Sequence, residues 1–271
     1  MISHKHKCIF VHIPKNAGSS VEKAFGFSEV YHQGTARHAP VWSMLGFWQT
    51  QTNYKEYPLS VERGKKKLFP RCHHDGSYAM HFDEYPKFAI CRNPWDRLVS
   101  TWKYDQKLLN AVTDNSLVAT DSSASLKWLR TRRDFYKVYL DEIGNDFGNF
   151  VKNLYTGWFG ALGKRDWVNL SPKKNPPNLP VYLWIKWHMH SQMTFIVDEK
   201  NNVRVDDILR FENLSEDWDK LCEKHGWDLE LPHTNKSSGK HYTEYYDDET
   251  RDMVARRYAT DIEYFDYKFG G

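Results

Sequence analysis

The sequence predicts an α/β fold of one domain, with a central parallel β-sheet flanked by helices. The main observation is a pattern that occurs twice: a short apolar run ends in a polar loop, and the loop leads into a helix. The first such unit covers residues 8–25 and the second covers residues 88–102. Repeated strand–loop–helix units are typical of parallel sheets, in which ligand-binding loops lie at the strand ends. The chain also lacks any internal repeat at the periods of solenoid proteins.

The residues at the ends of each segment support the predicted strand and helix in both units. In the first unit, the apolar run Cys8–Ile13 has the length of a buried strand, and Pro14 ends it. A helix with hydroxyl side chains at its start is expected at Ser19–Phe25. In the second unit, Phe88–Cys91 is the predicted strand, and Pro94 suits the first position of the following helix.

Four further elements are expected towards the C-terminus. Strands are expected at Met193–Val197 and Asp207–Phe211. Helices are expected at Ser215–His225 and Asp248–Thr260. Residues 28–86 contain many turn-forming residues and histidines, which indicates irregular structure with short helices.

Composition excludes several classes of protein. Aromatic residues make up 15% of the 271 residues, which excludes disorder for most of the chain. A net charge of +3 is too small to indicate a nucleic-acid partner. Because no apolar run approaches the roughly 18 residues of a membrane span, no membrane partner is expected. The four cysteines are widely spaced and fit reduced thiols, and we see no secretory signal, so a cytoplasmic location is expected.

The loop at residues 12–20 combines a positive charge with hydrogen-bonding groups. Lys15 is a mobile cation, and Gly18 lets the backbone approach a ligand closely. Ser19 and Ser20 add hydroxyl donors. At a helix N-terminus, free N–H groups and the helix dipole attract an anion. The lysine precedes the glycine, so this is not the nucleotide P-loop, and an ordinary strand-to-helix turn with an exposed lysine is the alternative.

A second candidate anion site follows the second strand. Arg92 stands at the strand end and can hold a phosphate through two parallel hydrogen bonds. Ser100, two turns along the next helix, is expected to face the same phosphate. For Arg97 we expect a structural ion pair with Asp96 or Glu212. Two anion sites at strand ends predict a ligand with two phosphate-like groups.

These residues resemble the sulfotransferases, in the branch that includes carbohydrate sulfotransferases (sulfotransferase family 2-like). Residues 12–20 read His-Ile-Pro-Lys-Asn-Ala-Gly-Ser-Ser and resemble the 5′-phosphosulfate loop, H-I-P-K-T-A-G-T-S. Residues 92–100 resemble the 3′-phosphate motif, R-N-P-x-x-R-x-x-S. Residues 208–214, 231–237 and 258–267 are similar to later motifs, in the family's order. The resemblance implies a P-loop NTPase/kinase-like sulfotransferase fold over residues 1–271.

The resemblance also implies a donor, 3′-phosphoadenosine 5′-phosphosulfate (PAPS), with the bisphosphate PAP as product and no metal. The implied donor-binding residues are Lys15, Asn16, Ala17, Gly18, Ser19, Ser20, Arg92, Ser100, Lys236 and Ser237. An acceptor hydroxyl attacks the sulfur in line, and Lys15 stabilises charge on the leaving oxygen. Residues 104–190 match no motif of the family. We expect this variable segment to bind the acceptor, a carbohydrate or a small molecule.

A general base is needed to take the proton of the acceptor, and histidine titrates in the right range. His38 lies where this branch often has a histidine after the first helix, and His81, shortly before the second strand, is its rival. Both residues therefore remain catalytic candidates beside Lys15. His12 lies inside the first strand run, where we expect a structural role.

Other readings of the sequence stay open. Residues 72–75, Cys-His-His-Asp, together with His81 supply zinc-ligand types, but no second pair stands at zinc-finger spacing. A kinase-like phosphotransferase would need a Mg²⁺-binding carboxylate near the first loop and a P-loop lysine, and neither is evident. A non-catalytic nucleotide- or polyanion-binding module would keep both anion sites and lack the base.

Overall fold

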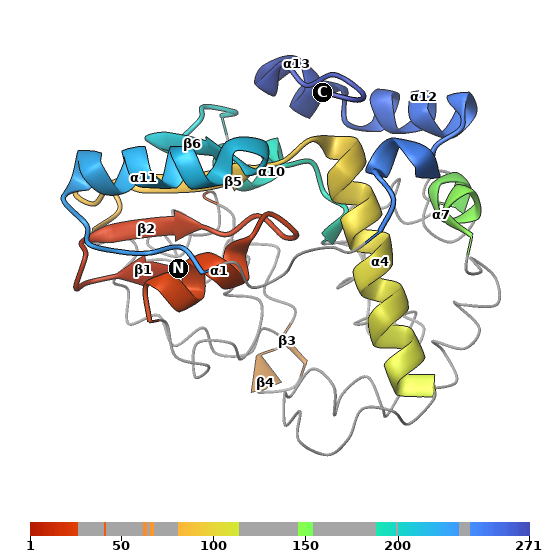
Figure 1. Cartoon of the computed structure of the whole chain (residues 1–271). Helices are drawn as coiled ribbons and strands as arrows, with labels where there is room; N and C mark the ends of the chain where they lie inside the picture. Colours follow the sequence, from red (N-terminus) through yellow and green to blue (C-terminus); the bar gives the residue numbers. More distant parts are fainter. Residues whose placement is uncertain are drawn as a thin grey trace. The chain divides into compact units, whose positions relative to one another are not determined.

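The computed structural model describes residues 1–26, 41, 62–63, 66–67, 81–113, 146–153, 188–198, 200–232 and 239–271 (Figure 1). The chain divides into two compact units. The sheet unit comprises Met1–Asn93 and Ser191–Ser238, and the helical unit comprises Pro94–His190 and Gly239–Gly271.

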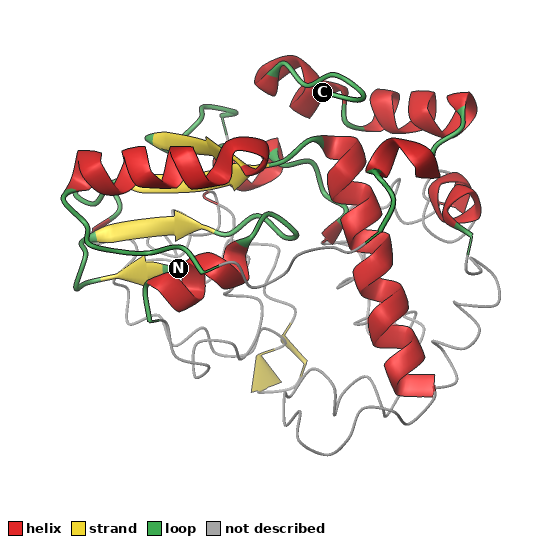
Figure 2. Cartoon of the chain, in the orientation of Figure 1, coloured by secondary structure: helices red, strands yellow, loops and turns green. Residues whose placement is uncertain are grey.

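A four-stranded sheet forms the centre of the sheet unit (Figure 2). Its strands are β1 (Ile2–Ser3), β2 (Cys8–Val11), β5 (Lys87–Cys91) and β6 (Asp207–Arg210), in the order β1-β2-β5-β6. Strands β2, β5 and β6 are parallel, and β1 pairs antiparallel with β2. The predicted α/β fold is confirmed, and the antiparallel edge strand makes the sheet mixed. A separate antiparallel pair is formed by β3 (Glu62–Arg63) and β4 (Lys66–Lys67).

Helices α1 (Gly18–Ala24) and α11 (Leu214–His225) cover one face of this sheet. Phe10 of β2 and Phe88 of β5 are paired in register, with ring centroids 4.9 Å apart. Phe25, just after α1, contacts Trp218 of α11 at 5.9 Å, so both helices share one apolar core with the strands. Every residue of β2 and β5 is buried, as expected for central strands with both faces covered.

One predicted strand is wrong. Residues predicted as a strand at Met193–Val197 form the one-turn helix α10 (Met193–Ile196), and only Val197 makes a β-bridge, to Val203. A short apolar run fits a buried helical turn as well as a strand, because both bury consecutive apolar side chains. Phe195 and Ile196 are fully buried here. The tertiary environment therefore decides the local structure.

The helical unit contains α4 (Pro94–Thr113), α7 (Phe147–Asn153), α12 (Asp248–Arg257) and α13 (Ala259–Phe265). Two 3-10 helices complete the described elements: η4 (Phe211–Asn213) in the sheet unit and η5 (Tyr242–Tyr245) in the helical unit. Of the described helices, even α4, with 20 residues, lacks the apolar composition of a membrane span.

The predicted helix at Asp248–Thr260 is interrupted at Tyr258, which separates α12 from α13. The Tyr258 hydroxyl donates to the carbonyl of Met189 at 2.8 Å, so this residue is held by a distant segment. At the other end of α12, Asp247 accepts a hydrogen bond from the Thr250 amide at 2.8 Å and caps the helix.

Many of the aromatic rings pack together in the helical unit. Trp102 of α4 lies 5.6 Å from Phe147 of α7, and Phe147 lies 4.8 Å from Tyr246. Trp95 contacts Phe269 at 5.6 Å. Core packing therefore accounts for this part of the high aromatic content.

Arg97 has a structural role in which its guanidinium bonds to backbone carbonyls, and the expected ion pair with Asp96 or Glu212 stays a prediction. Its guanidinium is buried and donates to the carbonyls of His190, at 2.8 Å, and His188, at 3.1 Å. Arg97 thereby holds residues 188–190 against α4.

Candidate functional site

The loop between β2 and α1 is held in a strained conformation. Lys15 and Ala17 have φ angles of 70° and 57°, in the left-handed region that residues with a side chain rarely adopt. Each such residue costs on the order of 1–3 kcal/mol, and such residues cluster at ligand sites. Ala17 is the N-cap of α1 and has no oxygen in its side chain to cap the first helical turn. Lys15 is half-buried, at the carboxyl end of β2.

A buried imidazole supports this loop. His12 is 3% exposed, and its Nδ1 lies 3.1 Å from Oε1 of Glu22, which is also buried. The ring of Phe10 stacks on that of His12, with centroids 5.4 Å apart. A Cβ atom at Gly18 would lie 1.8 Å from Nε2 of His12. Gly18 is therefore required by the imidazole packed against it, a reason that the sequence did not indicate.

We expect the Gly18→Ala variant to be less stable by about 1–3 kcal/mol, because the added methyl group overlaps the His12 ring. Urea unfolding measures the change. In a His12→Ala background the same glycine substitution is expected to cost much less, since the overlapping ring is absent. Equal costs in the two backgrounds would show that the overlap with His12 is not what requires a glycine.

Arg92 brings the second predicted segment to the same edge of the sheet. It follows β5 directly and is 7% exposed. Its Nη1 donates to the carbonyl oxygen of Lys15 at 3.0 Å. Its guanidinium lies 4.0 Å from the ring centroid of Phe211, just after β6. The carboxyl ends of β2, β5 and β6 thus bring together a lysine loop and an arginine held on an aromatic ring.

Sequence reasoning missed Gln192. This side chain is fully buried, and its Oε1 accepts hydrogen bonds from Asn16 Nδ2, at 2.7 Å, and from the Arg92 amide, at 2.9 Å. Its Nε2 donates to the Arg92 carbonyl at 2.8 Å. Gln192 stands 100 residues beyond Arg92 in a segment without any motif, so no local signal marked it.

Asn16 has its side chain directed towards β5. Its Nδ2 donates to the carbonyl of Ile90 and to Gln192 Oε1, both at 2.7 Å. The side chain is 1% exposed. Asn16, which was predicted to bind the donor, therefore supports the loop from within the protein through its side-chain amide.

The remaining predicted donor-binding residues have different positions. Ser19 and Ser20 lie in the first turn of α1, where Ser20 is buried and Ser19 is half-buried. Ser100 lies on α4 in the helical unit and is half-buried. The predictions for Lys236 and Ser237, and for the candidate base His38, fall outside the described residues.

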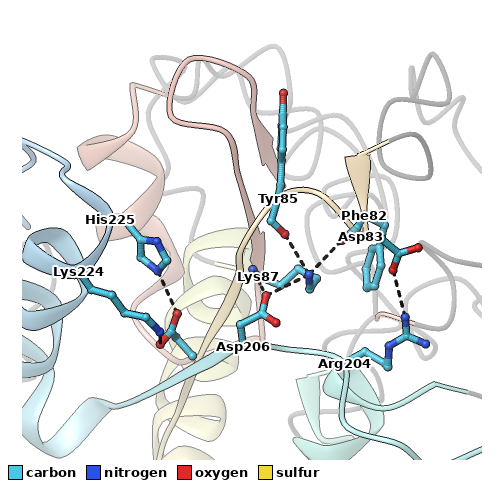
Figure 3. A network of polar contacts seen from close by, with 9 residues as sticks. Phe82, Asp83, Tyr85, Lys87, Arg204, Asp206, Lys224 and His225 are labelled. Atoms are coloured by element: carbon cyan, nitrogen blue, oxygen red, sulfur yellow. Dashed lines mark hydrogen bonds and ion pairs between the residues drawn. The ribbon is translucent and has the colours of Figure 1, made fainter.

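The opposite, amino edge of the sheet has its own polar network (Figure 3). Nζ of Lys87, the first residue of β5, donates to the carbonyls of Phe82 and Tyr85, both at 3.0 Å, and pairs with Asp206 at 3.0 Å. These contacts fasten residues 82–85 to the start of β5.

Asp207, the first residue of β6, belongs to the same edge. Its carboxylate pairs with Lys224 and His225 at the end of α11 (Figure 3). Burial alone would raise the pKa of Asp207, but the hydrogen bonds and charges of Lys224 and His225 outweigh it, and the pKa lies below its ordinary value. This pair anchors the end of α11 to the amino edge.

His81, the second candidate base, lies at this amino edge. Its ring stacks on Tyr85, with centroids 4.6 Å apart, and its Nδ1 is 3.0 Å from Oε2 of Glu84. Strand β5 has five residues and spans roughly 13 Å at about 3.3 Å per residue. Because Arg92 follows the other end of β5, the structure does not bring His81 to the lysine loop.

Metal-binding residue types do not gather in the part of the chain that the structure describes: no group of three or more His, Cys, Asp or Glu side chains is placed to hold an ion there. The motif at residues 72–75 falls outside the described residues. Cys8, Cys91 and Cys222 are buried, and burial raises the pKa of the Cys8 thiol to about 12.

A parallel-sheet edge with a lysine loop and a buried arginine suits the binding of an anionic group. The family model described as the sulfotransferase family matches residues 1–268, nearly the whole chain. The chain therefore belongs to the sulfotransferase family, which confirms the resemblance seen in its motifs. No curated protein and no solved structure gives a match.

Proposed function

We propose that this protein is a PAPS-dependent sulfotransferase that transfers a sulfonate group to a hydroxyl of a carbohydrate or a small molecule. The observation that carries the proposal is the hydrogen bond from Arg92 Nη1 to the carbonyl of Lys15, which joins the two predicted anion-binding segments at one sheet edge. Family membership supports sulfotransfer in general, and the two cationic segments support a donor with two anionic ends.

The residues present fit such a donor. The ammonium of Lys15 and the hydroxyls of Ser19 and Ser20 suit the 5′ end, and the guanidinium of Arg92 suits the 3′-phosphate. Ser100 stays a sequence-based prediction for the 3′-phosphate. When bound, the donor supplies the sulfonate group and the leaving 5′-phosphate oxygen. The side chain of Asn16 is not part of this donor set, because its amide bonds to β5 and Gln192.

The protein's own groups then act by position and charge. Lys15 neutralises the charge that develops on the leaving oxygen. Arg92, held by Phe211 and by the Lys15 carbonyl, orients the nucleotide so that the sulfur faces the acceptor. His38 takes the proton of the acceptor hydroxyl, and residues 104–190 contact the acceptor. Residues 1–271 form a single domain.

We expect Arg92→Ala to weaken binding of PAP roughly 10- to 100-fold, because a charge-assisted phosphate contact is worth about 1.5–3 kcal/mol. Isothermal titration calorimetry with PAP gives the dissociation constant. Arg204→Ala, which removes an arginine near the amino edge, is the matched control and should bind as the wild type does. Thermal unfolding of each variant separates loss of the contact from loss of the fold.

If wild-type protein does not bind PAP, or if Arg92→Ala binds it unchanged, the donor site is not where we place it. Two outcomes would point to the other functions. Binding of PAP without turnover across a wide panel of acceptors would indicate a non-catalytic binding module. Transfer of a phosphoryl group from ATP with Mg²⁺ would indicate a kinase-like enzyme.

A further inference from the structure

Strand β5 extends beyond its last residue that pairs with β2. The last pair between the two strands is Val11 with Ala89, after which the chain of β2 turns into the lysine loop. Backbone groups of β5 beyond this pair still need hydrogen-bond partners, because they are buried. Side-chain amides provide them: Asn16 Nδ2 bonds to the Ile90 carbonyl at 2.7 Å.

Gln192 likewise bonds to backbone groups, at Arg92, two residues beyond Ile90. Its amide donates to the Arg92 carbonyl at 2.8 Å and accepts from the Arg92 N–H at 2.9 Å. A neighbouring strand satisfies a backbone N–H and C=O in a similar manner, so this side chain replaces a strand where none is present. Its Oε1 also accepts from Asn16 at 2.7 Å, which ties the lysine loop to the same amide.

The buried amide pair is therefore the shared support of both anion-binding segments. Lys15 is the chain neighbour of Asn16, and Gln192 bonds to both backbone polar groups of Arg92. Because Gln192 is fully buried, bulk water does not reach its amide to replace these bonds. Moving Gln192 would change the distance between the lysine loop and the arginine.

We propose that Gln192 is a positioning residue that sets the spacing between Lys15 and Arg92, so that one ligand carrying two phosphate groups engages both. The inference rests on the proposed function, because the two-phosphate ligand is the nucleotide part of the donor. Gln192, together with Asn16, thereby gives the protein its preference for a bisphosphate over a monophosphate.

The test uses two nucleotides, PAP and adenosine 5′-monophosphate. A ligand that engages two sites at once gains affinity only when the spacing of the sites matches its own. We expect Gln192→Met, which keeps the length of the side chain and removes its amide, to lower the ratio of the monophosphate Kd to the PAP Kd by about tenfold. The Kd of the monophosphate, which needs only one segment, should change little.

A folding defect gives a different result. Partial unfolding lowers the fraction of competent protein and affects both nucleotides alike, so the ratio stays constant. Asn16→Ala gives a second, independent variant that leaves the bonds between Gln192 and Arg92 in place. We expect it to lower the ratio in the same direction, and the double variant to be no worse than Gln192→Met alone, because both residues act as one unit.

Asn153→Ala is the matched control, because its amide bonds to the Asn149 carbonyl within α7, away from both anion-binding segments in sequence. The ratio of its monophosphate Kd to its PAP Kd should equal that of the wild type. A wild-type protein that binds both nucleotides equally would overturn the proposed function itself. A wild-type preference for PAP that persists in Gln192→Met and in Asn16→Ala would leave the function standing and overturn the role of Gln192.

Discussion

Lys15→Ala is expected to lower the turnover number of sulfonate transfer by about 10²–10³-fold. The reason is that Lys15 provides positive charge at the 5′ segment, where the leaving oxygen gains negative charge during transfer. Arg92 and the α1 amides remain in the variant and keep much of the binding of the nucleotide. The loss should therefore appear mainly in kcat, with a smaller change in the dissociation constant of PAP.

Steady-state kinetics with PAPS and an acceptor identified by panel screening measure this loss, and calorimetry with PAP measures binding. Lys220→Ala is the matched control, because Lys220 is exposed on α11 and pairs with Glu216 at 2.6 Å. A Lys15→Ala enzyme with unchanged kcat would remove Lys15 from the chemical step, even if donor binding were weakened.

His38→Ala is expected to lose all but a small residual turnover while binding of PAP survives. General base catalysis contributes about 10²–10⁴-fold, and no donor contact is assigned to this histidine. His81→Ala is the comparison variant. It should keep turnover near the wild-type value, since His81 stacks on Tyr85 at the amino edge of the sheet.

The two histidine variants are to be compared at several pH values. If His38 is the base, the acidic limb of the pH profile for kcat disappears with it, and residual activity no longer follows a group of histidine-like pKa. Normal turnover in His38→Ala together with loss in His81→Ala would transfer the role to His81.

Much of the sheet unit follows from local sequence. The runs at Cys8–Val11 and Phe88–Cys91 are apolar throughout, and proline stands beyond each strand, so the strands and the start of α4 could be located directly. Helix α11 was predicted within one residue at its start, and Gly226, with a φ of 68°, ends it. Lys15 and Arg92 could be placed at strand ends for the same reason.

Local sequence could not show which residues of the motifs bind a ligand and which support the fold. The amide of Asn16 and the glycine at position 18 belong to a ligand-binding motif, yet the structure uses both inside the protein, against β5 and against His12. The two candidate bases also look alike in sequence. Only the direction of β5 shows that His81 stands at the edge opposite to Arg92.

The chain order of apolar runs and turn residues is enough to specify a parallel sheet and the loops at its carboxyl edge, because each strand and loop depends on neighbours in sequence. The support of that edge depends on the tertiary structure. Gln192 reaches Arg92 across 100 residues of chain, and its amide has a role only because β2 turns away where β5 continues. A buried backbone group without a strand beside it must bond to whichever polar side chain the fold brings near. The periodicity of the sequence therefore does not indicate which side chain will make this bond.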